Sequence, residues 1–257
     1  MRSTLVQVNL PTDWDTVTII GVSDVHRGCD AFDEKSWVKF LKEVQADPRI
    51  RILLLGDLAH TATKESKSDV YKATMTLKEE LDALEAELKP VTEQIIGVVR
   101  GNHERRAVKL DSRDPMEDLC KFLGKPHLYQ GVSMAAKVTW GVKRNGKRQC
   151  LSIYAQHGFG GGKTKGAPAN MLAAMTLKCP VADLYFGGHF HQPHICWDRW
   201  EDLDLQNSKR MHRQRMLVST AAFVHYEEWL DEIGRAPAAR VIPRVTFDQD
   251  KNFTIRG

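Results

Sequence analysis

The sequence lacks the features that would place the chain in a membrane or in an oxidising compartment. Residues 1–15 contain Asp13 and Asp15 but no apolar core of a secretory signal. No segment is long and apolar enough to span a bilayer. The five cysteines are an odd, widely spaced set without a Cys-x-x-Cys pair, which argues against a disulfide framework and against a zinc ribbon. We therefore expect a cytoplasmic protein with no membrane attachment.

Strong net charge and breaks in composition are also absent. Lys and Arg number 37 against 33 Asp and Glu, a net charge of +4, which leaves nucleic-acid binding open without favouring it. A chain of 257 residues can bury a full core, and no change in composition divides it. We expect one domain, residues 1–257.

The hydrophobic pattern predicts alternating strands and helices in the first half. Short apolar runs predict strands at 17–22, 50–55 and 95–99, and helical stripes are found at 33–44, 66–89 and 115–123. The leucine stripe of 66–89 predicts packing against the sheet rather than a dimer seam. Later strands are expected at 132–142, 148–155, 181–186, 194–197, 216–220, 240–247 and 253–256, with a helix at 169–177. Asn145-Gly146 is a strong hairpin signal, and the second half is expected to be mainly antiparallel.

Polar residues follow five of the predicted strands at the point where each strand ends. The segments are Asp24-Val25-His26, Gly56-Asp57, Gly101-Asn102-His103-Glu104, His157-Gly158 and Gly188-His189-Phe190-His191. Residues two apart on a strand share one side, and a carboxylate beside an imidazole suits a divalent first-row metal. Taken alone, each motif is also explained by turn chemistry or a solvated imidazole. Five such segments together indicate one site at the edge of a sheet.

Two further stretches leave alternatives open. Residues 159–166 form a glycine-rich loop with Lys163, which suits either an anion-binding loop or a flexible linker. Basic residues surround the predicted hairpin turn (Lys143, Arg144, Lys147 and Arg148) and fill the run 209–215. They indicate either a solvated surface or contact with a polyanion.

The ordered set of motifs from Asp24 to His191 resembles the calcineurin-like metallophosphoesterase superfamily, and the compact length resembles its small bacterial or phage-type members. The resemblance implies an α/β fold, a four-layer α/β/β/α sandwich with mixed sheets. It also implies two divalent metal ions held by Asp24, His26, Asp57, Asn102, His157, His189 and His191. Asp57 would bridge the two ions; Asp24, His26 and His191 would complete one, and Asn102, His157 and His189 the other. Mixed carboxylate, amide and imidazole ligation favours manganese, with iron or zinc as alternatives.

The resemblance implies hydrolysis of phosphoesters, chiefly phosphodiesters, by a hydroxide that bridges the two metals. His103 is the predicted catalytic residue, which would protonate the leaving alkoxide or stabilise its charge. Candidate cations for the remaining oxygens are Arg27, Arg105, Arg106 and Lys163, each of which is also explained as a surface cation. Nucleotides, nucleic acid and phosphomonoesters are alternative substrates.

The sequence differs from one branch of this superfamily, and the difference narrows the range of expected functions. Gly56-Asp57 is followed by Leu58-Ala59-His60 rather than by Asp-Arg-Gly, which disfavours a protein phosphatase. The alternatives are a DNA or RNA nuclease and a non-catalytic metal-binding interaction module on the same fold. His60, His194 and His225 match no ligand position, and Glu104 is assigned only a supporting position behind the ligands. The sequence leaves the oligomeric state open.

Overall fold

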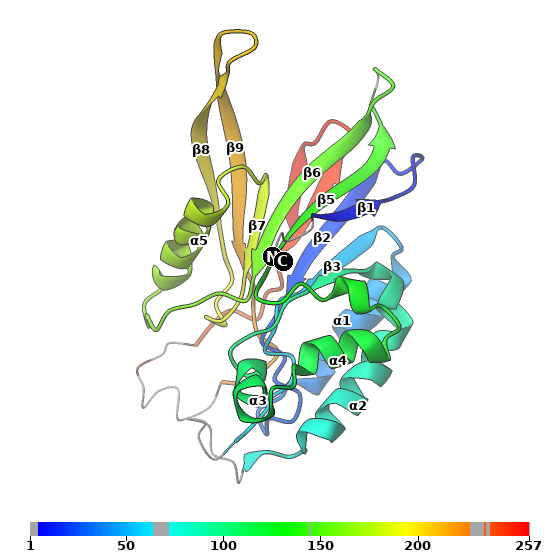
Figure 1. Cartoon of the computed structure of the whole chain (residues 1–257), viewed down its shortest axis with the longest axis vertical. Coiled ribbons are helices and arrows are strands. Elements are labelled where there is room, and N and C mark those ends of the chain that lie inside the picture. The colour runs from blue at the N-terminus through cyan, green and yellow to red at the C-terminus, as the bar shows by residue number, and fades with distance from the viewer. Residues whose placement is uncertain (1–4, 64–71, 144, 227–233, 235–236, 257) are drawn as a thin grey trace.

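Two β-sheets lie face to face with helices on their outer sides (Figure 1). The computed structural model describes residues 5–63, 72–143, 145–226, 234 and 237–256. The five-stranded sheet has the order β11-β10-β2-β3-β4, and the six-stranded sheet has the order β1-β5-β6-β7-β9-β8. The strands are β1 Val6–Asn9, β2 Thr16–Val22, β3 Ile50–Leu54, β4 Ile95–Val98, β5 Ser133–Val142, β6 Arg148–Gln156, β7 Leu184–Gly187, β8 His194–Asp204, β9 Lys209–Ser219, β10 Arg244–Asp248 and β11 Phe253–Arg256. The α-helices are α1 Glu34–Ala46, α2 Leu77–Leu88, α3 Glu104–Asp111, α4 Pro115–Phe122 and α5 Ala167–Lys178.

Strands β2, β3 and β4 are parallel and buried on both faces. Successive side chains of a strand point to opposite faces, so Ile20 packs beneath the helices with Trp37 and Leu84. Its neighbour Ile19 packs between the two sheets with Trp140. These apolar runs hold the carboxyl ends of the three strands at one edge of the sheet, where the polar motifs follow.

A third core lies between the six-stranded sheet and α5. Met171 and Leu172 of the helix pack against Tyr154 and Tyr185 of the sheet. The layers are therefore helices α1, α2 and α4, the two sheets, and α5, which confirms the predicted α/β/β/α sandwich with mixed sheets. Within the described ranges, no helix combines the length and the apolar character needed to cross a membrane.

The second half of the chain is less antiparallel than predicted. In the six-stranded sheet β1 pairs with β5, β6 with β7, and β7 with β9 in parallel, whereas β5–β6 and β8–β9 are antiparallel. Strands β6 and β7 run parallel because α5 carries the chain across between them. The expectation of a mainly antiparallel half is therefore wrong.

Several element boundaries also differ from the prediction. Helix α2 begins at Leu77 behind a capping box of Thr76 and Glu79; residues 66–71 of the predicted helix lie outside the described residues. The leucine stripe packs under the sheet as predicted. Strand β10 begins only after Pro243, which cannot donate to the ladder. Strand β1 and helix α3 were not predicted, because each is too short for a clear period.

The Asn145-Gly146 hairpin between β5 and β6 is confirmed. The backbone N–H of Lys143 donates to the carbonyl of Lys147 over 2.7 Å. Arg148 is not part of a solvated tip, because its guanidinium donates to the backbone carbonyls of Leu10 and Thr139. Arg144 lies outside the described residues.

Candidate metal centre

The loops after β2, β3, β4, β6 and β7 carry all seven predicted metal ligands. Five of the seven have left-handed backbone: Asp24 (φ 55°), His26 (52°), Asp57 (50°), His189 (73°) and His191 (58°). Such angles are uncommon outside glycine, and they turn the chain sharply where each side chain leaves the strand end. Gly101 keeps space for Asp57, since a Cβ there would lie 2.1 Å from Asp57 Oδ1.

Asp24, His26 and His191 form one group of donors. His191 Nε2 lies 3.2 Å from Asp24 Oδ1 and 3.2 Å from His26 Nε2. His26 Nε2 lies 3.9 Å from the same Asp24 oxygen. The donor atoms of the three residues all lie within 4.8 Å of one another, close enough to bind one ion.

A second group joins residues from four loops. Asp57 Oδ2 lies 3.2 Å from His157 Nε2. Asn102 Oδ1 lies 3.0 Å from His157 Nε2 and 2.8 Å from His189 Nδ1. Asp24, Asp57 and His157 also offer donor atoms within 4.8 Å of one another, so Asp24 connects this group to the first.

The hydrogen bonds around these donors fit divalent ions. His157 Nδ1 donates to the Leu55 carbonyl at 2.9 Å, and His189 Nε2 donates to the Gly160 carbonyl at 2.8 Å. Each bond leaves the other ring nitrogen as an acceptor that can bind a metal. Asp24 Oδ1 is buried without a hydrogen-bond partner among the described residues. A buried, unsatisfied carboxylate oxygen beside two imidazole nitrogens is the arrangement that a cation would satisfy.

Ionisable groups within the centre shift one another's pKa. Burial opposes ionisation of Asp24, but the neighbouring His191 outweighs it and lowers the pKa of Asp24. Burial also opposes charge on His157, yet the Asp57 carboxylate raises the pKa of His157 to about 10. The cluster thus holds its carboxylates in the ionised form that binds metal, whereas His157 must release its Nε2 proton when a metal binds.

The sequence model of the family described as calcineurin-like phosphoesterase matches residues 17–193, a stretch that contains all seven predicted ligands. The chain belongs to this family. No curated protein matches the sequence.

Three solved structures align with this calcineurin-like phosphoesterase over most of its length. A conserved uncharacterized protein from Streptococcus pneumoniae, a predicted phosphoesterase, has 13% identity and a TM-score of 0.38, covering 94% of this chain and 98% of that chain. A metallophosphoesterase from Sphaerobacter thermophilus has 15% identity and a TM-score of 0.41, covering 93% and 87%. Vps29 from Entamoeba histolytica, complexed with Zn²⁺, has 12% identity and a TM-score of 0.43, covering 93% and 90%.

His103 of the phosphoesterase lies beside the donors without joining either group. Its backbone N–H donates to Asp57 Oδ1 at 2.8 Å, and its Nδ1 lies 2.7 Å from the His60 carbonyl. The carbonyl can only accept, so Nδ1 carries a hydrogen and Nε2 has the free lone pair. Arg106 lies 3.2 Å from that Nε2. Burial lowers the pKa of His103, which Asp57 opposes and the Arg106 cation reinforces.

His60, which matches no ligand position, lies beside the predicted ligands. Its side chain is buried, and its ring centroid lies 6.0 Å from that of His26 and 5.5 Å from that of His103. The three histidines offer nitrogens within 4.8 Å of one another. The only sequence signal is its position three residues after Asp57.

Glu104 supports the centre through the backbone. Its fully buried carboxylate accepts from the N–H groups of Asp57 at 2.9 Å, Leu58 at 2.8 Å, Ala59 at 3.2 Å and Gly101 at 2.8 Å. One side chain thus joins the loop after β3 to the loop after β4. Glu104 was predicted to support the ligands from behind, and its hydrogen bonds hold Asp57 and the Gly101-Asn102 turn in position.

The predicted substrate-binding cations lie in different surroundings. Arg27 lies 3.0 Å from Glu87 and 3.8 Å from Glu34, and its guanidinium covers the Phe32 ring, so its charge is engaged between α1 and α2. Arg105 and Lys163 are exposed. Of the four predicted cations, the described contacts place only Arg106 against His103.

Proposed function

We propose that this phosphoesterase is a dinuclear-metal-dependent hydrolase that acts mainly on phosphodiesters. The convergence of seven donors from five strand ends supports the proposal most directly. Asp24, His26 and His191 would hold one ion, Asn102, His157 and His189 the other, and Asp57 both. When bound, two divalent ions would activate water and neutralise charge on the phosphoryl oxygens. The mixed oxygen and nitrogen donors favour manganese.

His103 would serve the leaving group. With Nδ1 committed to the His60 carbonyl, a proton on Nε2 could pass to the departing alkoxide. A bound phosphodiester anion would favour that protonated form by bringing negative charge next to the ring. The His103 side chain is 13% exposed, so the imidazole is held in place while one edge stays accessible.

Arg106 would bind a phosphoryl oxygen. Its guanidinium already lies against His103, and a planar guanidinium suits bidentate recognition of phosphate. Arg27 is engaged by two carboxylates instead. One permanent cation beside two metal ions suits the single negative charge of a diester better than the double charge of a monoester.

The alternative functions receive less support. The nuclease hypothesis rests on the basic residues of the hairpin (Lys143, Arg144, Lys147 and Arg148) and on the basic run 209–215. Arg148 donates to backbone carbonyls. Arg213 lies 2.6 Å from Asp202 and Arg215 donates to Asp198 at 2.7 Å, which neutralises two cations of the run. A non-catalytic module would not need His103 or its Nε2 directed at the donors. The five free cysteines support the proposed cytoplasmic location, and we treat residues 1–257 as one catalytic domain.

A hydrolysis panel tests the proposal. The manganese-loaded protein would be assayed on an aryl phosphodiester, an aryl phosphomonoester, a cyclic nucleotide and single-stranded DNA. We expect the diester to be hydrolysed fastest. His103→Ala should keep its metal content but lose about 10²- to 10⁴-fold in turnover, with the larger loss on alkyl diesters because their leaving groups need the proton more.

The control is His127→Ala, which changes an exposed histidine outside the centre and should leave every rate unchanged. A metal-loaded protein that hydrolyses none of the four substrates would refute the enzyme proposal. Equal alkyl diester rates for His103→Ala and the control would refute the role of His103.

A further inference from the structure

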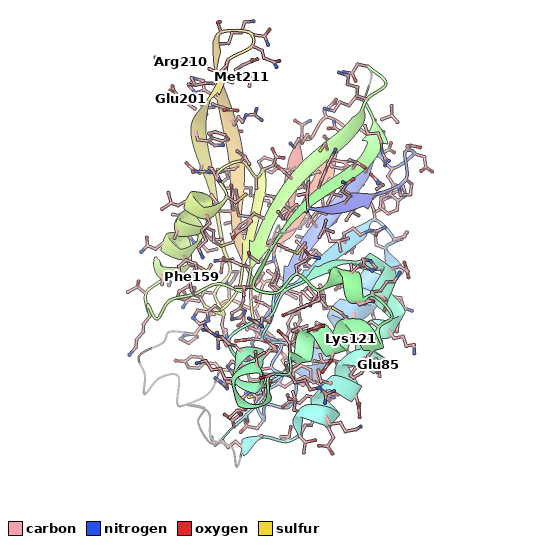
Figure 2. All side chains as sticks on the ribbon, in the orientation of Figure 1. Glu85, Lys121, Phe159, Glu201, Arg210 and Met211 are labelled. Atoms are coloured by element: carbon pink, nitrogen blue, oxygen red, sulfur yellow. The ribbon has the colours of Figure 1, made fainter. Side chains whose placement is uncertain are left out.

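Strands β8 and β9 form a long hairpin at the end of the six-stranded sheet. Each strand has 11 residues, and the hairpin extends past the other strands (Figure 1). Glu201, Arg210 and Met211 lie on this extended part (Figure 2). Strand β8 begins at His194, just after the metal centre, and runs away from it. The extended half of the hairpin therefore has no place in the proposed hydrolysis.

One face of the extended hairpin is satisfied internally. Arg213 lies 2.6 Å from Asp202, and Arg215 donates to Asp198 at 2.7 Å. Both guanidinium groups lie near the Trp200 ring, 6.0 and 5.9 Å from its centroid. The aspartates of β8 on this face are thus neutralised by arginines of β9.

The opposite face of β8 carries four exposed side chains in alternate positions: Trp197, Arg199, Glu201 and Leu203. Trp197 stacks on Phe253 of β11, with ring centroids 6.1 Å apart, and is still 54% exposed; Leu203 is 61% exposed. Strand β8 is the last strand of its sheet, and within the described ranges no strand pairs with its outer side. An edge with unpaired N–H and C=O groups and exposed apolar side chains is a template for another strand.

We propose that a second copy of this chain pairs with β8, edge to edge and antiparallel, about a two-fold axis at Trp200. In that register Arg199 faces the partner's Glu201, and Glu201 faces the partner's Arg199. Trp197 faces the partner's Leu203, and Leu203 the partner's Trp197. Every exposed residue of this face thus meets a complementary residue, and opposite charges on directly facing residues stabilise a ladder.

The neighbouring registers fail on the same criterion. Facing residues of an antiparallel pair lie on the same face of the sheet. A two-fold axis perpendicular to the sheet must therefore lie between one residue and the same residue of the partner, and each register is named here by that residue. An axis at Arg199 sets two arginines against each other, and an axis at Glu201 sets two glutamates against each other. The axis at Trp200 sets Asp198 against the partner's Asp202, but each is already paired with an arginine of its own hairpin.

Charged residues on an edge strand commonly prevent pairing. Here the alternation of one basic and one acidic residue about Trp200 makes the edge complementary to itself, as a two-fold interface requires. The two copies would form one continuous sheet centred on Trp200, and the metal centres would stay open because β8 runs away from them after His194.

Charge exchange tests the proposal in the full-length protein by analytical ultracentrifugation. The wild type should be a dimer, and R199E and E201R should each weaken dimerisation by at least about tenfold, because each places like charges opposite one another. The double variant R199E/E201R should restore the dimer. An equimolar mixture of the two single variants should form a heterodimer, because one chain is then acidic and the other basic at both positions.

R210E is the matched control: it makes the same charge change on an exposed residue of β9, away from the edge, and should leave the dimer intact. A monomeric wild type at roughly 100 μM, well above the dissociation constant of a micromolar interface, overturns the proposal. A dimer that persists in both single variants, or one that the double variant does not restore, also overturns it. Binding of single-stranded DNA that R199E abolishes in a monomeric wild type would assign the edge to a polyanion instead.

Discussion

Glu104→Gln should unfold more easily than the wild type, because the substitution removes acceptors from a site with four donors. The carboxylate accepts two N–H groups at each oxygen: Leu58 and Ala59 at Oε1, Asp57 and Gly101 at Oε2. A glutamine keeps one carbonyl oxygen and places an NH₂ group against the other pair of donors.

The magnitude follows from the two N–H groups that lose their acceptor. Glu104 is fully buried, so water does not replace the lost oxygen, and each unsatisfied buried donor costs about 1 to 3 kcal/mol. We therefore expect the free energy of unfolding to fall by about 2 to 6 kcal/mol. That is a large part of the roughly 5 to 15 kcal/mol that stabilises a typical domain.

The assay is urea unfolding of the chelator-treated protein, which separates this effect from metal binding. Glu93→Gln is the matched control, because Glu93 is 83% exposed and pairs with Lys125 at the surface; it should change the free energy by less than about 0.5 kcal/mol. Manganese affinity should also fall in Glu104→Gln, because Asp57 and the Gly101-Asn102 turn lose their common anchor. Superimposable urea curves for the two variants would refute this account of Glu104.

Three other perturbations have defined outcomes. Asp57→Ala should lose both metal ions by elemental analysis, whereas two ions per chain would rule out the bridging role. Gly101→Ala should lose metal because its Cβ would lie 2.1 Å from Asp57 Oδ1, and Gly161→Ala, with open space around it, should bind metal normally. Burial raises the pKa of Glu80 from 4.5 to about 8, so the folded state binds a proton that the unfolded state releases, and this contribution to stability is lost as pH rises from about 4.5 to 8. Glu80→Gln mimics the protonated acid, so its stability relative to the wild type, measured by thermal unfolding, should rise from pH 5 to pH 8 by up to about 4 kcal/mol at 1.4 kcal/mol per pKa unit. A pH-independent difference would contradict the shift.

The convergence of the donors could be predicted because it depends on strand ends. Parallel buried strands show as apolar runs, and their carboxyl ends share one edge, so the sequence alone places Asp24, Asp57 and Asn102 together. The fold class followed from the same alternation and from the family resemblance.

The remaining features depend on contacts that leave no periodic signal. His60 enters the site only because the loop after β3 folds back beneath His103. Arg27 and Arg106 look alike in sequence, yet one meets Glu87 and the other meets His103. The length of β8 was missed because its extended half is exposed on one face and only half-buried by charged pairs on the other, so charged residues replace the hydrophobic alternation that marks a half-buried strand.

Five of the predicted ligands stand on backbone that glycine would adopt more easily. A left-handed non-glycine residue costs of order 1 kcal/mol, so replacing His26 or His191 by glycine would relieve strain while deleting a donor. Selection for stability alone would therefore erode this centre, and each loss would make the chain easier to fold. In this chain all five positions keep a side chain that can bind a metal, despite the cost of left-handed backbone in stability.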